Sequence, residues 1–202
     1  MLRLLGWSPL IQAAFDKNRD LFSPVPPIEP YEAPSTLAPL RDPYVPLPGL
    51  LVLHVRRGDF EEHCAHLARW GSSFNAFNSF PELPDQWSTP PGGGDGETTE
   101  ANMQLYLRRC FPSVQQIVQK VDEVRRARGG AGLRNVYVMT NAKKRWAEEL
   151  KGALRRMDGW DRIATSRDLV LSKEQKYVAQ AVDMLIGQRA QVLIGNGVGA
   201  RP

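Results

Sequence analysis

The stretch LVLHVRRGDF, residues 51–60, passes directly from aliphatic to charged residues. Its first three residues are typical of a buried strand, because leucine and valine side chains are stabilised by removal from water. The residues after them carry charge or a hydrogen-bonding ring: His54, Arg56, Arg57 and Asp59. A buried strand that ends in clustered positive charge favours an anionic ligand beyond the strand end.

The chemistry of these residues suits a phosphate or a diphosphate. Arginine presents a planar fork of donors that matches two phosphate oxygens, and it stays charged at any working pH. In an extended segment alternate side chains share a face, so we expect His54 and Arg56 on one side and Arg57 on the other. His54 could add a donor to a diphosphate, and Asp59 could hold an arginine in place or neutralise it. The alternative interpretation is a structural salt-bridge cluster that closes the strand end.

Composition excludes few classes of protein. The 202 residues suit one ordinary domain with an appendage, or two small domains, and the 42% of hydrophobic residues is enough for a sizeable core. Lys and Arg exceed Asp and Glu by only 26 to 22, which does not indicate a nucleic-acid binder but is compatible with a phosphate-bearing ligand. No apolar run approaches the roughly 18 residues of a membrane span. Residues 1–22 match a signal peptide poorly, because Gly6, Trp7 and Pro9 interrupt their apolar run.

Hydrophobic periodicity predicts alternating helices and strands. Strands are expected at 50–55, 135–140, 161–166 and 190–196, the last of them ending the sheet. Helices are expected within 1–22, from 113 to the RGGAG breaker at 128–132, over 142–157, and after a capping box at Ser172 and Gln175. The proline-dense segment 23–49 is predicted to be a stiff connector, and PPGGGDGE at 90–97 a surface loop. This order predicts a parallel, three-layer α/β sheet with helices on both faces.

Three polar segments follow strands of this predicted sheet. They are HVRRGD at 54–59, TNAKK at 140–144 and GNG at 195–197. Parallel α/β sheets bind ligands beyond the carboxyl ends of their strands, so these segments are expected to meet at one site. Asn141 is a plausible N-cap, and Lys143, Lys144 and Arg145 then fall in a first helical turn, where an anion would offset their unfavourable interaction with the helix dipole. A solvated basic face is the alternative explanation for these three cations.

Two other segments have a simpler interpretation. His63, Cys64 and His66 could suggest a metal site, but Cys64 would point away from the histidines and no fourth ligand follows, so we expect a solvated helix with a buried cysteine and no metal. Residues 69–87 are rich in aromatic side chains, and a loop held by its own aromatic residues is favoured over a platform for RNA bases. We therefore expect no nucleic-acid partner. Cys64 and Cys110 could form a disulfide or remain as two thiols.

Residues 50–196 resemble the superfamily of GDP-fucose-dependent protein O-fucosyltransferases. His54, Arg56 and Asp59 match the His-x-Arg-x-x-Asp pattern with which a strand of that family ends, and Arg57 is its frequent second arginine. The stretch VDMLIGQRAQVLIGN, 182–196, resembles the third motif of the family, a helix with an aspartate followed by an apolar strand that ends in Ile-Gly-Asn. The sequence of residues 61–88 is most similar to that of fungal members of the family.

The resemblance implies the C-terminal, Rossmann-like lobe of a GT-B glycosyltransferase that transfers fucose from GDP-fucose to an acceptor hydroxyl with inversion and without a metal or other cofactor. Arg56, Arg57 and Asp59 would be catalytic, with Arg56 stabilising the charge on the leaving diphosphate. The substrate-binding residues would be His54, Arg56, Thr140, Asn141, Asp183 and Asn196. The acceptor would be a protein or a glycan, and the location would be the secretory pathway.

The chain departs from the family at Asn141, in the segment after the third motif, and in its N-terminal part, where at most some fifty residues stand for the N-terminal lobe of the family. Asn141 stands where the family commonly has an aspartate that contacts guanine, so it keeps an acceptor oxygen but loses the charge. A Ser/Thr-rich loop usually follows the third motif, whereas this chain continues GVGARP. We therefore expect residues 1–49 to be a remnant of the N-terminal lobe plus a linker, and 50–202 to be a nucleotide-sugar-binding domain that is incomplete at its C-terminus. A non-catalytic module that binds a nucleotide or a phosphate is the alternative function.

Overall fold

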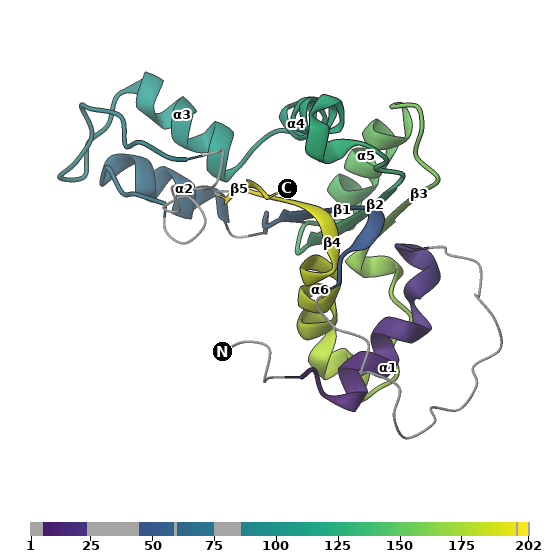
Figure 1. Cartoon of the computed structure of the whole chain (residues 1–202). Helices are drawn as coiled ribbons and strands as arrows, with labels where there is room; N and C mark the ends of the chain where they lie inside the picture. Colours follow the sequence, from purple (N-terminus) through teal and green to yellow (C-terminus); the bar gives the residue numbers. More distant parts are fainter. Residues whose placement is uncertain (1–5, 24–44, 59, 75–85, 197, 202) are drawn as a thin grey trace, which may run out of the picture.

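The computed structural model describes residues 6–23, 45–58, 60–74, 86–196 and 198–201 (Figure 1). These residues form a five-stranded sheet in the order β3-β2-β1-β4-β5. Its strands are β1 Leu47–Val55, β2 Asn135–Thr140, β3 Arg162–Thr165, β4 Ala190–Gly195 and β5 Val198–Arg201. The first four are parallel to one another, and β5 is antiparallel to β4. The predicted Rossmann-like α/β fold is therefore confirmed.

Helices cover both faces of this sheet (Figure 1). Helices α1 Pro9–Lys17 and α6 Ala179–Gln188 pack on one face, and α4 Val114–Arg126 and α5 Lys144–Arg155 pack on the other. Helices α2 Phe60–Arg69 and α3 Glu100–Cys110 pack with each other in a separate cluster. Short 3₁₀ turns lie between them: η2 Arg19–Leu21, η4 Arg128–Gly130, η5 Ser166–Asp168 and η6 Gln175–Val178. Among the described helices, none is both long and apolar enough to span a bilayer.

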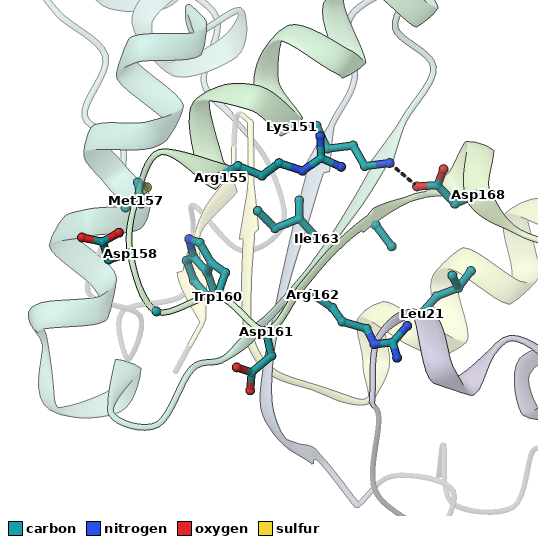
Figure 2. Close-up of a pocket in the computed structure, with 12 residues that line it drawn as sticks. Leu21, Lys151, Arg155, Met157, Asp158, Trp160, Asp161, Arg162, Ile163 and Asp168 are labelled. Atoms are coloured by element: carbon teal, nitrogen blue, oxygen red, sulfur yellow. Dashed lines mark hydrogen bonds and ion pairs between the residues drawn. The ribbon is translucent and has the colours of Figure 1, made fainter.

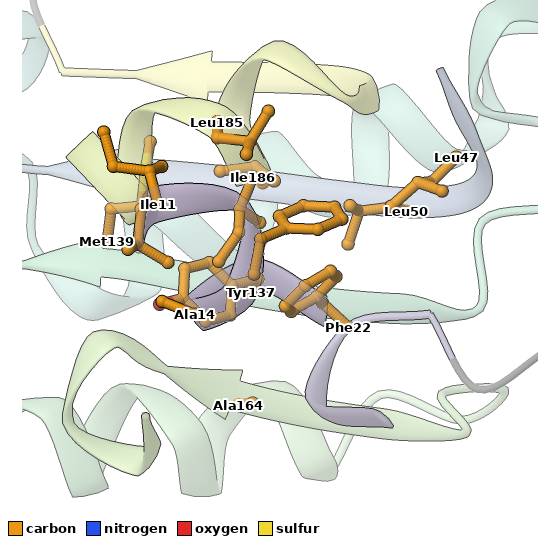
Figure 3. Packing of buried hydrophobic residues seen from close by; sticks show 13 residues of the cluster. Ile11, Ala14, Phe22, Leu47, Leu50, Tyr137, Met139, Ala164, Leu185 and Ile186 are labelled. Atoms are coloured by element: carbon orange, nitrogen blue, oxygen red, sulfur yellow. The ribbon is translucent and has the colours of Figure 1, made fainter. Parts of the chain in front are cut away.

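Alternation along β1 divides the core into two layers. Leu51 and Leu53 pack with α4 and α5 on one face, whereas Leu50 and Val52 pack with α1 and α6 on the other. All four leucine and valine side chains are fully buried. Figure 3 shows the second layer, in which Phe22 approaches Tyr137 of β2. The described N-terminal residues therefore belong to the same core as the sheet, whereas their origin as the remnant of another lobe stays a prediction.

The capping box predicted at Ser172 forms, as does another at Ser113 that was not predicted, and they explain where two helical segments begin. The Ser113 hydroxyl accepts the Gln116 backbone N–H while the Gln116 side chain accepts the Ser113 N–H, which fixes the start of α4. Ser172 and Gln175 make the same reciprocal pair. The turn that follows this second pair is the 3₁₀ turn η6, and α6 begins only after it.

Two predicted boundaries were wrong. The connector predicted over 23–49 ends earlier, because β1 begins at Leu47, whose N–H donates to the Arg189 carbonyl at 2.6 Å. Gly49 permits this irregular start by adopting a φ of 78°. The strand predicted at 190–196 does not end the sheet, since β5 pairs with it as an antiparallel edge strand. Residues 24–44 of the predicted connector lie outside the described residues.

Helices α2 and α3 form a unit that a disulfide between Cys64 and Cys110 crosslinks. We call this unit the disulfide hairpin. The sequence left open whether these cysteines form a disulfide or remain as two thiols, and the structure shows the disulfide. Both cysteines are fully buried. Phe74 and Trp87 pack against Tyr106 of α3, as expected of a loop held by its own aromatic residues; residues 75–85 of that segment lie outside the described residues. In Figure 1 the disulfide hairpin lies beyond the end of β1, beside β5.

Asn18 joins the end of α1 to the loop after β3. Its buried amide donates to the carbonyls of Ala14 and Val170 and accepts the Val170 N–H at 2.7 Å. Asn18→Ala is expected to lower the free energy of unfolding by about 1–3 kcal/mol, because buried backbone groups lose their partners. Urea unfolding measures this change, with Lys17→Ala on the exposed side of α1 as a matched control. Equal stability of the two variants would contradict this role of Asn18.

Candidate functional site

The ends of β1, β2 and β4 bring the three predicted polar segments together. In the sheet register His54 lies between Met139 of β2 and Gly195 of β4, and Val55 pairs with Thr140. Strand β1 has its sequence neighbour β2 on one side and the distant β4 on the other, so the connection direction reverses between β1 and β4. This is the switch point at which doubly wound sheets bind ligands. We call residues 54–58, 140–142 and 195–196 the strand-end site.

Asn196 fixes the backbone on the β4 side of this site. Its side-chain oxygen accepts the Arg56 N–H at 2.9 Å, and its side-chain nitrogen donates to the carbonyls of Arg56 and Cys110. Its own N–H donates to the His54 carbonyl at 3.1 Å. Asn196 therefore connects β1, β4 and the disulfide hairpin, and it sets the path of the chain at Arg56.

Asn141 plays the corresponding part on the β2 side. Its side-chain oxygen accepts the Arg57 N–H at 2.7 Å. A side chain at Gly58 would place a Cβ only 2.6 Å from the Asn141 nitrogen, so it would displace the Asn141 amide from its present position. The prediction that Asn141 caps the following helix was wrong, since α5 begins at Lys144 and the residue before it is Lys143. The Asn141 amide instead holds the loop that carries Arg56 and Arg57, which we call the arginine loop.

Thr140 is also engaged within the protein. Its hydroxyl donates to the Val55 carbonyl at 2.6 Å and accepts the Ala142 N–H at 3.1 Å. The three side chains Thr140, Asn141 and Asn196 thus make hydrogen bonds that shape the strand-end site. Contact of these residues with a substrate stays a prediction. Asp59 lies outside the described residues, as does Gly197.

His54, in β1, and Arg56, which follows the last residue of β1, have exposed polar side chains. The Arg56 guanidinium lies over the Phe60 ring, 5.0 Å from its centroid. The pKa of His54 is lowered chiefly because surrounding protein atoms displace part of its water, although the ring still reaches the surface. The negative charge of Asp183 partly opposes this shift, and the positive charge of Arg56 adds to it.

Arg57 enters a different environment. Its guanidinium carbon lies 3.7 Å from the centroid of the Phe111 ring and 4.6 Å from that of Trp146. Its Nη1 donates a short hydrogen bond to the Pro112 carbonyl. Burial lowers the pKa of Arg57, and the carboxylates of Glu61 and Glu149 act in the opposite direction.

Asp183 lies on α6, below the strand ends, and accepts the hydroxyl of buried Tyr137 at 2.7 Å. Burial raises the pKa of Asp183, while hydrogen bonds from Tyr137 and Ser166 and the nearby His54 lower it. Burial beside this carboxylate also raises the pKa of Tyr137, because a phenolate would be poorly solvated and repelled. Asp183 is thus bound to a core tyrosine and close enough to act electrostatically on His54.

The raised pKa of Asp183 predicts a pH dependence of stability. The folded chain holds this proton more tightly than the unfolded chain, so the associated stability is present below the unfolded pKa and is lost as pH rises through the folded pKa. Asp183→Asn keeps an oxygen for Tyr137 and has no proton to lose. Its unfolding free energy relative to the native chain should rise by up to about 1.4 kcal/mol per pH unit within that window.

Urea unfolding of both proteins between about pH 3 and pH 7 measures this difference, since it spans the ordinary range of aspartate pKa values and the region above it. Asp16→Asn, on an exposed part of α1, is the matched control for removal of a carboxylate. A stability difference that stays flat, or falls as pH rises, would show that Asp183 does not hold its proton as described.

A cavity of about 590 Å³ lies away from the strand-end site (Figure 2). It borders the edge strand β3, and Trp160, Arg162 and Ile163 are among its lining residues. Lys151 and Asp168 also line it and form an ion pair at 2.8 Å, drawn as a dashed line in Figure 2. A second lining carboxylate, Asp161, pairs with Arg134, which lies outside the lining, so the volume of the cavity does not by itself make it the better candidate. The strand-end site is the stronger candidate for a ligand site, because it lies at the switch point of the sheet.

Sequence reasoning missed the aromatic partners of Arg57. Phe111 follows the last residue of α3, and Trp146 lies in the first turn of α5, and nothing in their local sequence indicates a common partner. It also missed Tyr137, which the strand pattern marks only as a core residue. Among the described residues, no group of three or more histidine, cysteine, aspartate or glutamate side chains is placed to hold a metal ion.

Comparison of the chain with protein-family models, with curated proteins and with solved structures finds no match. The assignment of function therefore rests on the residues of the strand-end site and on the sheet that positions them. The resemblance to O-fucosyltransferases is carried by the motifs alone.

Proposed function

We propose that the strand-end site binds a nucleotide diphosphate sugar and that the chain transfers fucose from GDP-fucose to an acceptor hydroxyl of a protein or glycan. The observation that carries the proposal is the position of Arg56. This exposed arginine follows the central strand β1 at the switch point of the sheet, with its backbone held by Asn196. An arginine fixed there is suited to a diphosphate, because it offers two parallel donors and a permanent charge.

In the proposed reaction the acceptor hydroxyl attacks the anomeric carbon from the face opposite GDP. The bond between that carbon and the diphosphate oxygen breaks, GDP leaves with the bonding electrons, and the hydroxyl proton passes to solvent. Arg56 stabilises the negative charge that develops on the leaving diphosphate. The lowered pKa of His54 favours a neutral ring, which can still donate one N–H to a phosphate oxygen. Positive charge from Arg56 would serve where other enzymes use a metal.

Isothermal titration calorimetry with GDP, together with an assay of GDP release from GDP-fucose, tests the proposal. We expect GDP to bind and ADP to bind more weakly, since the Asn141 side-chain oxygen, which accepts the Arg57 N–H, has a second lone pair that can accept an N–H of guanine. If GDP binds but no GDP is released from GDP-fucose in the presence of candidate acceptor peptides and glycans, the transfer reaction is contradicted and only the binding of a nucleotide is supported. Absence of any heat with GDP would overturn the proposal.

A second candidate is a non-catalytic module that binds a nucleotide or phosphate. It is favoured by the internal hydrogen bonds of Thr140, Asn141 and Asn196, which use atoms that a donor sugar would otherwise contact. This candidate predicts heat on titration with GDP but no release of GDP from GDP-fucose. The same two measurements therefore separate the two functions.

The buried disulfide supports the expected location. Disulfides persist mainly in oxidising compartments, and that between Cys64 and Cys110 closes a loop with a sequence separation of 46 residues. We therefore propose that the protein is located in the secretory pathway. Mass spectrometry of the protein isolated from its cells under alkylating conditions checks this: fully alkylated, unpaired cysteines would contradict it.

A further inference from the structure

Arg57 differs from Arg56 in what its guanidinium contacts. It packs against Phe111 and Trp146 and donates to the Pro112 carbonyl, whereas Arg56 lies at the exposed strand end. We call Phe111, Pro112 and Trp146 the arginine cage. The two rings cover the faces of the Arg57 guanidinium and the Pro112 carbonyl accepts one of its N–H groups, so contacts within the protein fix its plane and position.

The arginine cage joins three parts of the fold. Phe111 and Pro112 lead out of α3, Trp146 belongs to α5, and Arg57 follows β1. The residue before Phe111 is Cys110, which the disulfide ties to α2 and whose carbonyl accepts the Asn196 amide. The backbone N–H of Arg57 is held from the β2 side by Asn141. Every described contact of Arg57 thus fixes the loop that carries Arg56.

We propose that Arg57 is a positioning residue, which holds Arg56 in place through the arginine cage and does not itself touch the ligand. This inference rests on the proposed function, in that the ligand of Arg56 is taken to be a diphosphate. It reassigns the second arginine of the motif from catalysis to support. It also adds Phe111 and Trp146 to the residues on which ligand affinity depends.

The role requires the planar shape of arginine as well as its charge. A lysine keeps the charge but cannot lie flat on a ring while donating to Pro112. Arg57→Lys is therefore expected to weaken GDP binding about tenfold, the order of magnitude of a lost cation–π contact. Phe111→Leu removes no charge and should weaken GDP binding to a similar extent. Phe111→Tyr keeps an aromatic face and should restore nearly native affinity.

Titration calorimetry of the full chain with GDP measures these affinities. If Arg57 contacted phosphate directly, Phe111→Leu would bind GDP as tightly as the native chain, and this result would overturn the inference. Equal loss in Phe111→Leu and Phe111→Tyr would overturn it as well, because an aromatic face would then not be what matters. Weakening by Arg57→Lys and Phe111→Leu with recovery in Phe111→Tyr is the result that the inference expects.

A second measurement needs no ligand and so separates this inference from the proposed function. The chain is labelled with 5-fluorotryptophan, and the ¹⁹F resonance of Trp146 is assigned with the Trp146→Phe variant. We expect Arg57→Gln and Phe111→Leu to shift this resonance, and Arg56→Ala to leave it in place. An unshifted Trp146 resonance in Arg57→Gln would overturn the cage even if GDP binds. Absence of GDP binding by the native chain, with these shifts present, would instead count against the proposed function alone.

Discussion

Arg56→Ala is expected to lower the rate of fucosyl transfer by about 10²–10³-fold, the usual cost of losing one donor that stabilises a developing negative charge. The guanidinium follows the central strand β1, where a bound diphosphate would gain charge as the sugar leaves. Because that charge grows from the bound substrate towards the transition state, the loss should be larger in kcat than in the affinity for GDP-fucose. Steady-state kinetics, paired with calorimetric titration of GDP-fucose in the absence of acceptor, measures both quantities.

The matched control is Arg156→Ala, which removes another exposed arginine, immediately after the last residue of α5. It lowers the net charge by the same amount but should change the rate less than twofold, since exposed charges remote from the site are screened by salt. Similar losses in the two variants would mean that Arg56 acts only through net charge. A native transfer rate in Arg56→Ala would remove the basis of the proposed mechanism.

Phe22→Ala should produce the largest loss of stability among the variants considered, about 3–5 kcal/mol in the free energy of unfolding. The Phe22 side chain is fully buried, and its ring centroid lies 5.0 Å from that of Phe15 and 5.8 Å from that of Tyr137. Removing the ring leaves a cavity between the N-terminal residues and β2. Urea unfolding, followed by tryptophan fluorescence, measures the change.

Phe22→Leu is the control for size, because it fills part of the cavity and should cost clearly less than the alanine variant. Leu10→Ala, at a partly exposed position of α1, controls for substitution within the same segment. The expectation follows from the shared core of α1 and the sheet. A loss below about 1 kcal/mol in Phe22→Ala, as at a surface position, would mean that this segment is not part of the cooperative core.

Periodicity predicted most of the fold correctly because buried parallel strands and amphipathic helices leave strong local patterns. It failed at the start of the central strand β1 and at the edge strand β5. The first residues of β1 include Pro48 and Gly49, which are rare in strands, and are held by pairing with the distant β4. Strand β5 is short and contains a glycine, so its assignment also depends on a partner rather than on its own sequence.

The strand-end site was predicted by position, whereas its internal contacts were not. Parallel strands must bring their carboxyl ends to one edge, so HVRRGD, TNAKK and GN could be placed together from the sequence. Asn141 and Asn196 hold the arginine loop by accepting the backbone N–H groups of Arg57 and Arg56. These N–H groups donate to side chains, rather than within a strand or helix, because of how the whole sheet is arranged, and no local sequence pattern predicts this. The pairing of Cys64 with Cys110 depends in the same way on how α2 and α3 pack.

The most direct test of the account is to record ¹H–¹⁵N correlation spectra of the labelled chain during a titration with GDP. The account predicts that the amide resonances of Arg56, Arg57 and Asn196 shift as GDP saturates the protein, and that those of Trp160 and Arg162, beside the cavity at β3, stay in place. Shifts confined to the cavity at β3, or a spectrum unchanged by GDP, would contradict the claim that the switch point of the sheet holds a diphosphate.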